Sequence, residues 1–329
     1  MVVHRKPLQD GEFLPFELDL AQRRVLLLRL TEAQRASAPF LDERARPASA
    51  EAVWLPLQDV VEEGRASPSL GACWIFHIGH CGSTLLSRLL QSWPHLQVLR
   101  EPLPLRSLAA AVCQGALSGR EAATLGDVMV RLWARAPGLL QTTLVKATSS
   151  CNMLAGPLLS MRKEDRAILL AMPLRSYLAT LLKSASSIRD ALAAADERMM
   201  FLQDVLPASS AMALPKSAGE ICAMGWLAEQ VRFEALSTAS ERIKRMDFEH
   251  LLANPRSALA SAVEHLQLDK AHLDAALASP WWHRYAKAGD HAYGVEDRRH
   301  DQALALARFA DEIARGVAWV RDASPRHAS

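Results

Sequence analysis

The chain has almost no excess of charge of either sign. Its 329 residues include 38 Lys and Arg against 36 Asp and Glu, a formal net charge of +2. Broad binding to nucleic acid needs a clustered positive field, so this balance argues against a nucleic-acid partner. No uninterrupted hydrophobic run reaches the length that crosses a membrane, and acidic residues follow the N-terminal Met1–Pro7 instead of an apolar run. We therefore expect a cytoplasmic protein without a membrane span, whose partners are small molecules.

Cysteine is scarce, and repeats are absent. The five cysteines are scattered and odd in number, which suits a reducing compartment better than a disulfide framework, and none has the spacing of a zinc site. We find no internal repeat or low-complexity tract. Half of the residues are hydrophobic, which is ample for a core. Composition is thus consistent with an ordinary globular protein of the enzyme class, and we expect no metal.

One stretch, Phe76–Leu90, has the pattern of a buried strand, a glycine turn and an amphipathic helix. It reads FHIGHCGSTLLSRLL, with Gly79 and Gly82 in the turn and leucines at helical spacing after it. The N–H groups of Gly82, Ser83 and Thr84 would open the helix, where free amides and the helix dipole favour an anion. The stretch therefore predicts a cradle for a phosphate or sulfate group, although a turn without a ligand is the alternative.

The stretch lacks the lysine of the commonest phosphate loop, GxxxxGK[ST]. That lysine reaches the β- and γ-phosphates of a nucleoside triphosphate. Here Ser83 directly follows Gly82, so a triphosphate with its magnesium is poorly served. A ligand with one compact anionic group fits better.

Strand and helix patterns alternate along most of the chain. We expect strands near 73–78, 96–99, 142–146, 167–171 and 243–247, separated by helices. This order is typical of an α/β fold with a doubly wound parallel sheet, in which right-handed crossovers bring all the site loops to one edge. Ser83, Glu101, Lys146 and Arg175 would converge there.

The first part of the chain differs from the rest and is expected to be a small appendage. Residues 13–18 and 24–30 have the pattern of short extended pieces, and Thr31 is placed to cap a helix over 33–41. We therefore divide the chain into an N-terminal appendage, 1–68, and an α/β domain, 69–329. The segment 204–219 lacks periodicity and carries two prolines; it is either a lid over an acceptor or simply a mobile loop.

Several segments between about residues 70 and 295 together resemble the sulfotransferases that use 3′-phosphoadenosine 5′-phosphosulfate (PAPS), as a divergent, bacterial-type member. The P-loop-like turn His80-Cys81-Gly82-Ser83-Thr84 stands where that family binds the 5′-phosphosulfate. Val98–Pro102 looks like a short strand ending in the glutamate that several branches use as a base, here Glu101. Thr143–Thr148 is similar to a strand ending in a lysine, here Lys146.

The same resemblance implies a second anion site, for the 3′-phosphate of the donor. Ala167–Thr180 looks like the strand and helix that bind this group, but Met172 and Thr180 stand where the family usually has an arginine and a serine. The sequence leaves open whether nearby side chains replace the lost charge or form a solvated helix face. A C-terminal segment, 284–293, resembles a loop that closes over the donor. The candidate donor-binding residues are Gly79, His80, Cys81, Gly82, Ser83, Thr84, Arg175, Thr180, Lys183, Ser184 and Lys287.

The resemblance implies transfer of a sulfonate group from PAPS to a hydroxyl or amine. Glu101 would be the general base, if burial and neighbours raise its pKa. It could instead merely end a strand and pair with Arg100 or Arg106. His80 and Lys146 are the candidate cations that stabilise the transferring group, although His80 could also be a structural residue.

Two other functions stay open. A P-loop kinase or nucleotide hydrolase is disfavoured by the missing loop lysine and by the lack of a clear magnesium-binding aspartate. A catalytically degenerate scaffold that binds a nucleotide or a partner protein without turnover is the non-enzymatic alternative. The acceptor, whether a small molecule, a glycan or a peptide, is not fixed by the sequence, because variable loops build acceptor walls.

Overall fold

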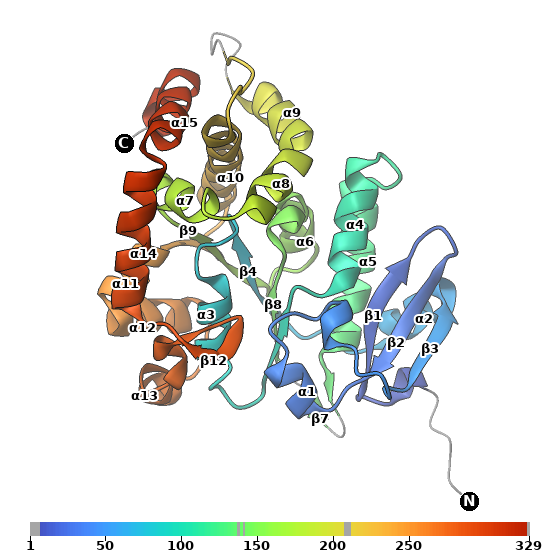
Figure 1. Cartoon of the computed structure of the whole chain (residues 1–329). Coiled ribbons are helices and arrows are strands. Elements are labelled where there is room, and N and C mark those ends of the chain that lie inside the picture. Colours follow the sequence, from blue (N-terminus) through green and yellow to red (C-terminus); the bar gives the residue numbers. More distant parts are fainter. Residues whose placement is uncertain (1–6, 137–138, 141, 207–211, 328–329) are drawn as a thin grey trace, which may run out of the picture.

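The centre of the protein is a parallel five-stranded sheet flanked by helices (Figure 1). The computed structural model describes residues 7–136, 139–140, 142–206 and 212–327. The strand order is β10-β9-β4-β8-β5, and every neighbouring pair is parallel. The α/β fold class expected from the sequence is confirmed, and each expected strand is right to within one residue at either end. The strands are β4 (Ala72–His77), β5 (Leu96–Arg100), β8 (Thr142–Lys146), β9 (Arg166–Ala171) and β10 (Ile243–Asp247).

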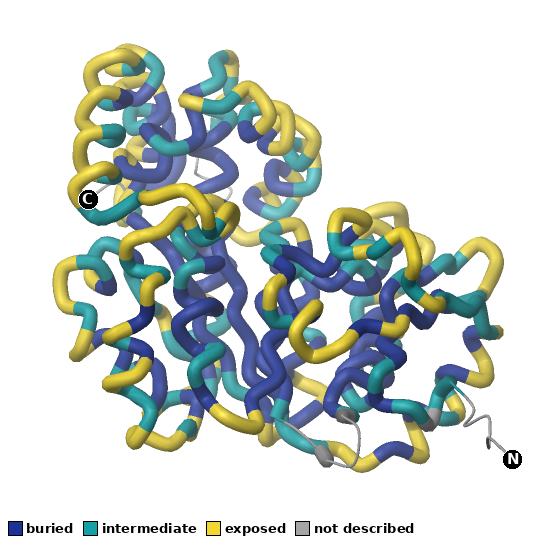
Figure 2. The backbone as a smooth tube through the Cα atoms, turned by 60° about the horizontal axis from the view of Figure 1, so that its bottom comes forward, coloured by how far each residue is buried: buried dark blue, intermediate teal, exposed yellow. Residues whose placement is uncertain are grey.

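Helices cover both faces of this sheet, which is why its three central strands, β4, β8 and β9, are buried at almost every position (Figure 2). The chain moves one way along the sheet from β4 to β5 and the other way from β5 to β10, so right-handed crossovers place α3 on one face and the crossover helices from α4 to α10 on the other. The helices are α3 (Ser83–Leu90), α4 (Leu103–Cys113), α5 (Gly119–Trp133), α6 (Ala155–Met161), α7 (Leu174–Leu181), α8 (Ala185–Ala193), α9 (Ala195–Val205), α10 (Ala218–Ala239), α11 (Phe248–Ala253), α12 (Pro255–His265), α13 (Leu273–Leu277), α14 (Val295–Arg308) and α15 (Ala310–Ala323).

Residues 7–66 contain a small antiparallel sheet and two α-helices, and they share the hydrophobic core of the rest. Trp133 of α5, for example, donates from its indole to the carbonyl of Pro15 at 2.9 Å. The division at residue 68 stays a prediction. The elements are β1 (Phe13–Asp19), β2 (Arg24–Arg29), α1 (Glu32–Ser37), β3 (Ala52–Pro56) and α2 (Leu57–Ala66).

Thr31 caps α1 as expected, but the predicted length of this helix is wrong. The Thr31 hydroxyl accepts from Gln34 N at 3.2 Å, and the helix ends at Ser37 rather than at residue 41. Beyond that end, Leu41 N donates to Arg100 O at 2.7 Å, so the chain follows the end of β5 instead of continuing as a helix.

Two short antiparallel strand pairs lie outside the two larger sheets: β6 (Arg135–Ala136) with β7 (Leu139–Leu140), and β11 (Arg284–Tyr285) with β12 (Ala288–Ala292). The expected lid, 204–219, falls partly outside the described residues. Of its described part, Ala213 O accepts from the Trp319 indole at 2.9 Å, so this stretch lies against α15. None of the helices in the described part of the chain combines the length and apolar content that crossing a bilayer requires.

Candidate functional site

The glycine turn after β4 passes through left-handed backbone conformations at three positions. Gly79, His80 and Gly82 all have positive φ, at 84°, 53° and 75°. A Cβ on Gly82 would lie 1.9 Å from the Phe248 ring, so only glycine fits there. Within the described residues, no group accepts from the N–H groups of Gly82, Ser83 and Thr84 at the start of α3. These donors therefore have no protein partner in the described part of the chain, and their binding of an anion stays a prediction.

The side chains of the turn divide between the ligand side and the core. Ser83 and Thr84 are buried at the start of α3, and neither hydroxyl has a bonding partner in the described part of the chain. Cys81 faces the interior, where its thiol donates to Leu170 O at 3.3 Å and burial raises its pKa to about 12. Cys81 can therefore offer a ligand its backbone but not a thiolate.

Glu101 follows β5 beside the turn and is held by two cations. Its φ is 55°, an uncommon value for a residue other than glycine, and its N–H donates to Lys146 O at 2.7 Å. One carboxylate oxygen accepts from Lys146 Nζ, and the other accepts from Arg106 Nη2 at 2.9 Å. The expected pairing with Arg106 is therefore present, whereas Arg100 turns elsewhere.

The expectation that the pKa of Glu101 is raised is wrong for the ligand-free protein. Burial alone would raise it, but the charges of Lys146 and Arg106 outweigh burial and lower the pKa to about 2. Glu101 is thus a stable carboxylate and a poor base as long as both cations stay in place.

Lys146 ends β8 and is almost completely buried, with 1% of its side chain exposed. Burial lowers its pKa, and the charge of Lys287, on the β11–β12 hairpin, acts in the same direction. Lys287 itself is exposed. Phe40 lies against both lysines, with its ring centre 5.3 Å from Lys146 Nζ and 5.7 Å from Lys287 Nζ.

The two histidines of the turn are neutral rather than cationic. His77 Nδ1 accepts from Gly79 N at 3.0 Å, so the proton is on Nε2, which is buried with no partner among the described residues. Burial, followed by the charge of Lys146, keeps the pKa of His77 well below its ordinary value. His80 is open to solvent at the mouth of the turn, but the surrounding protein and Lys287 lower its pKa to about 4. The fractional charge expected for His80 is therefore absent without a ligand.

Residues of the N-terminal part were missed by the sequence interpretation. Besides touching both lysines, Phe40 lies under Arg44, whose guanidinium carbon is 4.4 Å from the ring centre. Arg44 pairs with the buried Asp42, which lies 3.9 Å from Arg106. No motif marks these residues. One sequence feature could have pointed to them. Arg88 and Arg100 stand where the helix and strand patterns call for apolar residues, and a buried guanidinium group needs acceptors from another segment.

The residues expected at a 3′-phosphate site make mostly local contacts. Met172 is buried, and its carbonyl accepts from the Trp226 indole at 2.9 Å. Thr180 Oγ1 donates to Ser176 O, while Ser184 caps α8. Arg175 is exposed with no ion pair to the described residues, and Lys183 lies 3.6 Å from Asp301. Of the candidate cations outside the turn, the structure brings Lys287 to the Glu101–Lys146 corner.

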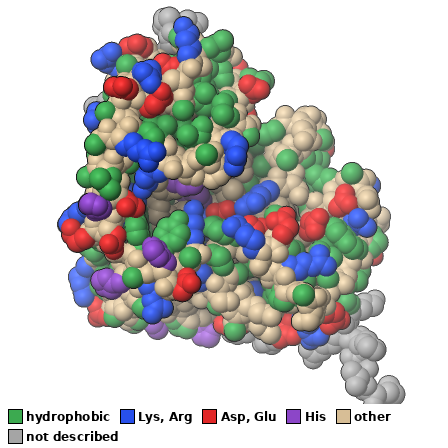
Figure 3. All heavy atoms as spheres, in the orientation of Figure 1, with side chains coloured by type: hydrophobic (Ala, Val, Ile, Leu, Met, Phe, Trp, Pro, Cys, Tyr) green, Lys and Arg blue, Asp and Glu red, His purple; other side chains and the backbone are tan. Residues whose placement is uncertain are grey.

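The corner defined by the turn, Glu101 and Lys146 lies where the strand order reverses. β4 and β8 are neighbours, and the chain leaves them toward opposite faces of the sheet, which is the usual position of ligand crevices in open α/β folds. On the face shown in Figure 3, the surface is hollowed between the upper helices and the lower part of the molecule, and charged side chains gather beside the hollow.

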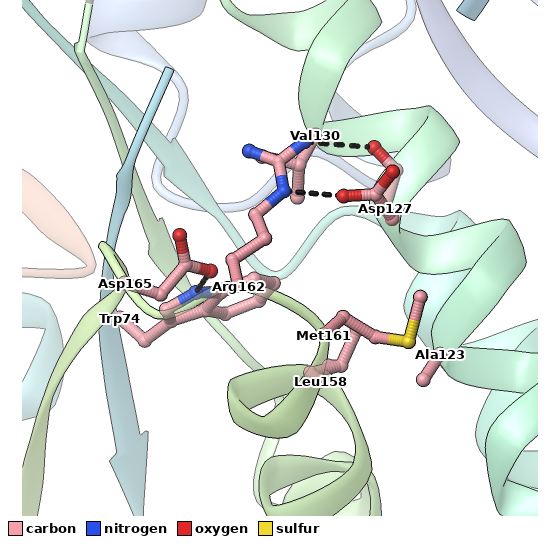
Figure 4. A pocket seen from close by; sticks show the side chains of 8 residues that line it. All are labelled: Trp74, Ala123, Asp127, Val130, Leu158, Met161, Arg162 and Asp165. Carbon is pink, nitrogen blue, oxygen red and sulfur yellow. Dashed lines mark hydrogen bonds and ion pairs between the residues drawn. The ribbon is translucent and has the colours of Figure 1, made fainter. Parts of the chain in front are cut away.

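A small cavity at the other end of the sheet is structural. It is lined by Trp74, Ala123, Asp127, Val130, Leu158, Met161, Arg162 and Asp165 (Figure 4). Its charged residues are already paired, Arg162 with Asp127 and Asp165 with the Trp74 indole. We assign it no ligand.

Comparison with known proteins returned likenesses of structure only. No protein-family model matches the chain, and no curated protein matches its sequence. Among solved structures, it is similar to the sulfotransferase domain from the curacin biosynthetic pathway (13% identity, 77% of this chain and 98% of that one, TM-score 0.42). It is also similar to the sulfotransferase domain of the Synechococcus PCC 7002 olefin synthase (14% identity, 74% of this chain and 96% of that one, TM-score 0.42). A sulfotransferase from Mycobacterium avium is 12% identical; the match covers 77% of this chain and 80% of that one, with a TM-score of 0.43.

Proposed function

We propose that the protein is a sulfotransferase that moves a sulfonate group from PAPS to a hydroxyl or amine acceptor. The observation that carries the proposal is the meeting of free helix amides with the Glu101–Lys146 pair at the reversal point of the parallel sheet. Sulfonate transfer needs both an anion cradle and a base within reach of it. The resemblance of the turn, Glu101 and Lys146 to sulfotransferase segments points the same way.

The corner carries an excess of positive charge that suits an anionic donor. Four cations and two carboxylates are linked there through contacts with one another or with Phe40, while the histidines are neutral, which leaves an excess of two positive charges. The phosphosulfate and the 3′-phosphate of the donor are both anionic and would share this excess. The groups are Arg44, Arg106, Lys146, Lys287, Asp42 and Glu101.

In the proposed reaction the acceptor oxygen or nitrogen forms a bond to sulfur while the bond from sulfur to the phosphate oxygen breaks. The acceptor proton passes to Glu101, and adenosine 3′,5′-bisphosphate leaves. Amides of Gly82, Ser83 and Thr84 would stabilise charge on the transferring and leaving groups without rearranging. His80 would assist, because a bound dianion raises the pKa of a neighbouring imidazole.

Glu101 can act as a base only if its pKa rises above the resting value of about 2. Lys146 provides the means, because its ammonium pairs with Glu101 in the resting protein and would pair with the sulfonate instead once the donor is bound. Losing that partner leaves Glu101 buried beside Arg106 alone, so burial then raises its pKa. The base would therefore become active only when the donor is bound.

The 3′-phosphate of the donor is assigned to Lys287, with Arg175, Lys183, Ser184 and Thr180 as further candidates. Met172 offers only its backbone carbonyl here, so the charge has to come from elsewhere. Lys287 is the cation whose position at the corner supports this role.

The proposal is tested by calorimetric titration with adenosine 3′,5′-bisphosphate, adenosine 5′-phosphate, and ATP with magnesium. Selective binding of the bisphosphate is the expected result. ATP as the tightest ligand would favour a kinase or nucleotide hydrolase and overturn the proposal. If none of the three binds, the catalytically degenerate scaffold becomes the preferred function. Two observations favour it among the alternatives: the low pKa of Glu101 and the apolar side chain of Met172.

A further inference from the structure

Phe40 is the point at which three separate parts of the chain meet around the anion corner. Its ring lies 5.3 Å from Lys146 Nζ of the sheet, 5.7 Å from Lys287 Nζ of the C-terminal hairpin and 4.4 Å from the guanidinium carbon of Arg44. All three distances are within the range of cation–π attraction. Phe40 itself is 7% exposed, so its ring is packed and not free to turn away.

Two buried arginines of the α/β part hold the backbone of this segment. Arg88 donates to Ala36 O at 2.6 Å and to Ser37 O at 2.8 Å, and Arg100 donates to Ala38 O at 3.0 Å. The N–H of Leu41 closes the arrangement on Arg100 O. Phe40 is therefore fixed from both sides along the chain, by the same strand end that carries Glu101.

The β11–β12 hairpin, which carries Lys287, packs next to Arg88 as well. The Arg88 guanidinium lies 4.4 Å from the ring centre of Trp281, and a Cβ on Gly289 of β12 would come within 2.9 Å of that ring. Arg88 thus links the N-terminal segment and the hairpin. The position of Lys287 relative to Lys146 is set through these contacts and the Phe40 ring.

Two ammonium groups that share one ring also repel each other. Lys287 already lowers the pKa of Lys146, which reports that repulsion. An exposed lysine side chain free of other contacts would move away into solvent, whereas the face of an aromatic ring attracts both cations without neutralising either. A carboxylate in this position would hold them too, but it would cancel the charge that an anion needs.

We propose that Phe40 is a positioning residue, which holds Lys146 and Lys287 together at the anion corner, so that the N-terminal part of the chain completes this site. The inference rests on the proposed function in taking adenosine bisphosphate as the ligand of the corner. Phe40 acts only through the two lysines.

The test compares Phe40→Leu with Phe40→Tyr and with Phe13→Leu. Leucine keeps an apolar side chain without a ring, and tyrosine keeps the ring. Phe13 is a matched control, because it is also 7% exposed, lies in the N-terminal part and contacts a cation, Arg29, but lies outside the corner. In calorimetry with adenosine 3′,5′-bisphosphate, we expect Phe40→Leu to weaken binding about 5- to 30-fold. Phe40→Tyr should restore binding to within about threefold, and Phe13→Leu should leave it unchanged.

A second measurement needs no ligand. Brief treatment with acetic anhydride, followed by mass spectrometry, gives the acetylation rate of Lys287 relative to the exposed Lys163 of the same molecule. We expect the ratio to rise severalfold in Phe40→Leu and not in Phe13→Leu, because the ring no longer holds the amine. An unchanged ratio, or a bisphosphate affinity equal to that of Phe13→Leu, would overturn the inference. Failure of the unaltered protein to bind the bisphosphate would instead count against the proposed function, while the acetylation ratio still decides whether Phe40 positions Lys287.

Discussion

The two ends of the central sheet both carry buried charges, but they use them differently. At the amino end, the Asp165 carboxylate accepts from Ala72 N and from the Trp74 indole, both at 2.8 Å. Arg242 donates to Asp165 O at 2.7 Å, and Arg162 pairs with Asp127. Each of these charges has a protein partner, and the cavity between them is small (Figure 4).

At the carboxyl end, several groups lack partners. The first amides of α3 are free within the described residues, and the His77 Nε2 proton is buried without an acceptor there. His80 and Glu101 have positive φ, a conformation that costs energy in residues other than glycine. Positive charge also exceeds negative charge. Buried charge alone therefore does not distinguish the two ends; the unpaired helix amides and the excess of positive charge at the carboxyl end do.

The largest expected effect that sharpens this contrast comes from Glu101→Gln. Removing a general base typically lowers a rate about 10²- to 10⁴-fold, and glutamine keeps the shape of the side chain. We expect transfer of labelled sulfonate from PAPS, to an acceptor found by screening, to fall by this factor. Affinity for adenosine 3′,5′-bisphosphate should change little, because the cradle amides are unaltered.

Arg106→Gln is the companion variant, since it removes the second partner of Glu101 without removing the carboxylate. It should raise the pKa of Glu101 and shift the pH dependence of transfer upward. Retained turnover in Glu101→Gln would eliminate Glu101 as the base, whatever Arg106→Gln shows.

Acid should lower the free energy of unfolding through protonation of Glu101. The folded pKa of Glu101 is about 2 against an ordinary 4.5, so its ionisation stabilises the fold above pH 4.5, and this stability is lost as the pH falls toward 2. The shift corresponds to at most about 3 kcal/mol, part of which the buried Lys146 offsets. We expect the difference in unfolding free energy between the unaltered protein and Glu101→Gln to shrink between pH 5 and pH 3. A difference independent of pH would show that the ion pair adds nothing.

At the amino end, Asp165→Asn should affect stability and not activity. The change weakens two buried hydrogen bonds to a charged acceptor, which costs about 1–3 kcal/mol in unfolding free energy. Chemical denaturation measures the loss, while bisphosphate affinity per folded molecule should stay the same. A loss of affinity as large as that of a cradle variant would mean that the two ends are coupled, and would remove the distinction drawn between them.

The sequence was sufficient for the sheet because β4 and β9, near its centre, are buried on both faces and have continuous apolar runs. It was also sufficient for placing the glycine turn, Glu101 and Lys146, since each lies at the carboxyl end of a strand, at the edge where loops converge. Membership of the turn in a donor site and the roles of these residues stay predictions.

The rest depended on contacts between distant segments. Phe40 lies 106 residues before Lys146 and 247 before Lys287 along the chain, and neither local pattern nor spacing brings them together. The raised pKa expected for Glu101 failed for the same reason, because burial was foreseeable but the simultaneous contact with Lys146 and Arg106 was not. The early end of α1 also involves distant residues, because Arg88 and Arg100 bind the backbone carbonyls at and just after that end.

The smallest predicted effect concerns the hydroxyls of the cradle. Ser83 and Thr84 are buried at the start of α3, and neither hydroxyl has a partner in the described part of the chain. Replacing both by alanine removes two donors but leaves the backbone amides, so affinity for the bisphosphate should fall about 5- to 50-fold rather than vanish. Ser92→Ala, just beyond the other end of the same helix, is the matched control and should bind normally. Equal affinity in all three proteins would exclude the hydroxyls from the anion site and leave the amides as its only donors. A complete loss would instead indicate that the turn itself has collapsed, which thermal unfolding would detect as a destabilisation not shared by the control.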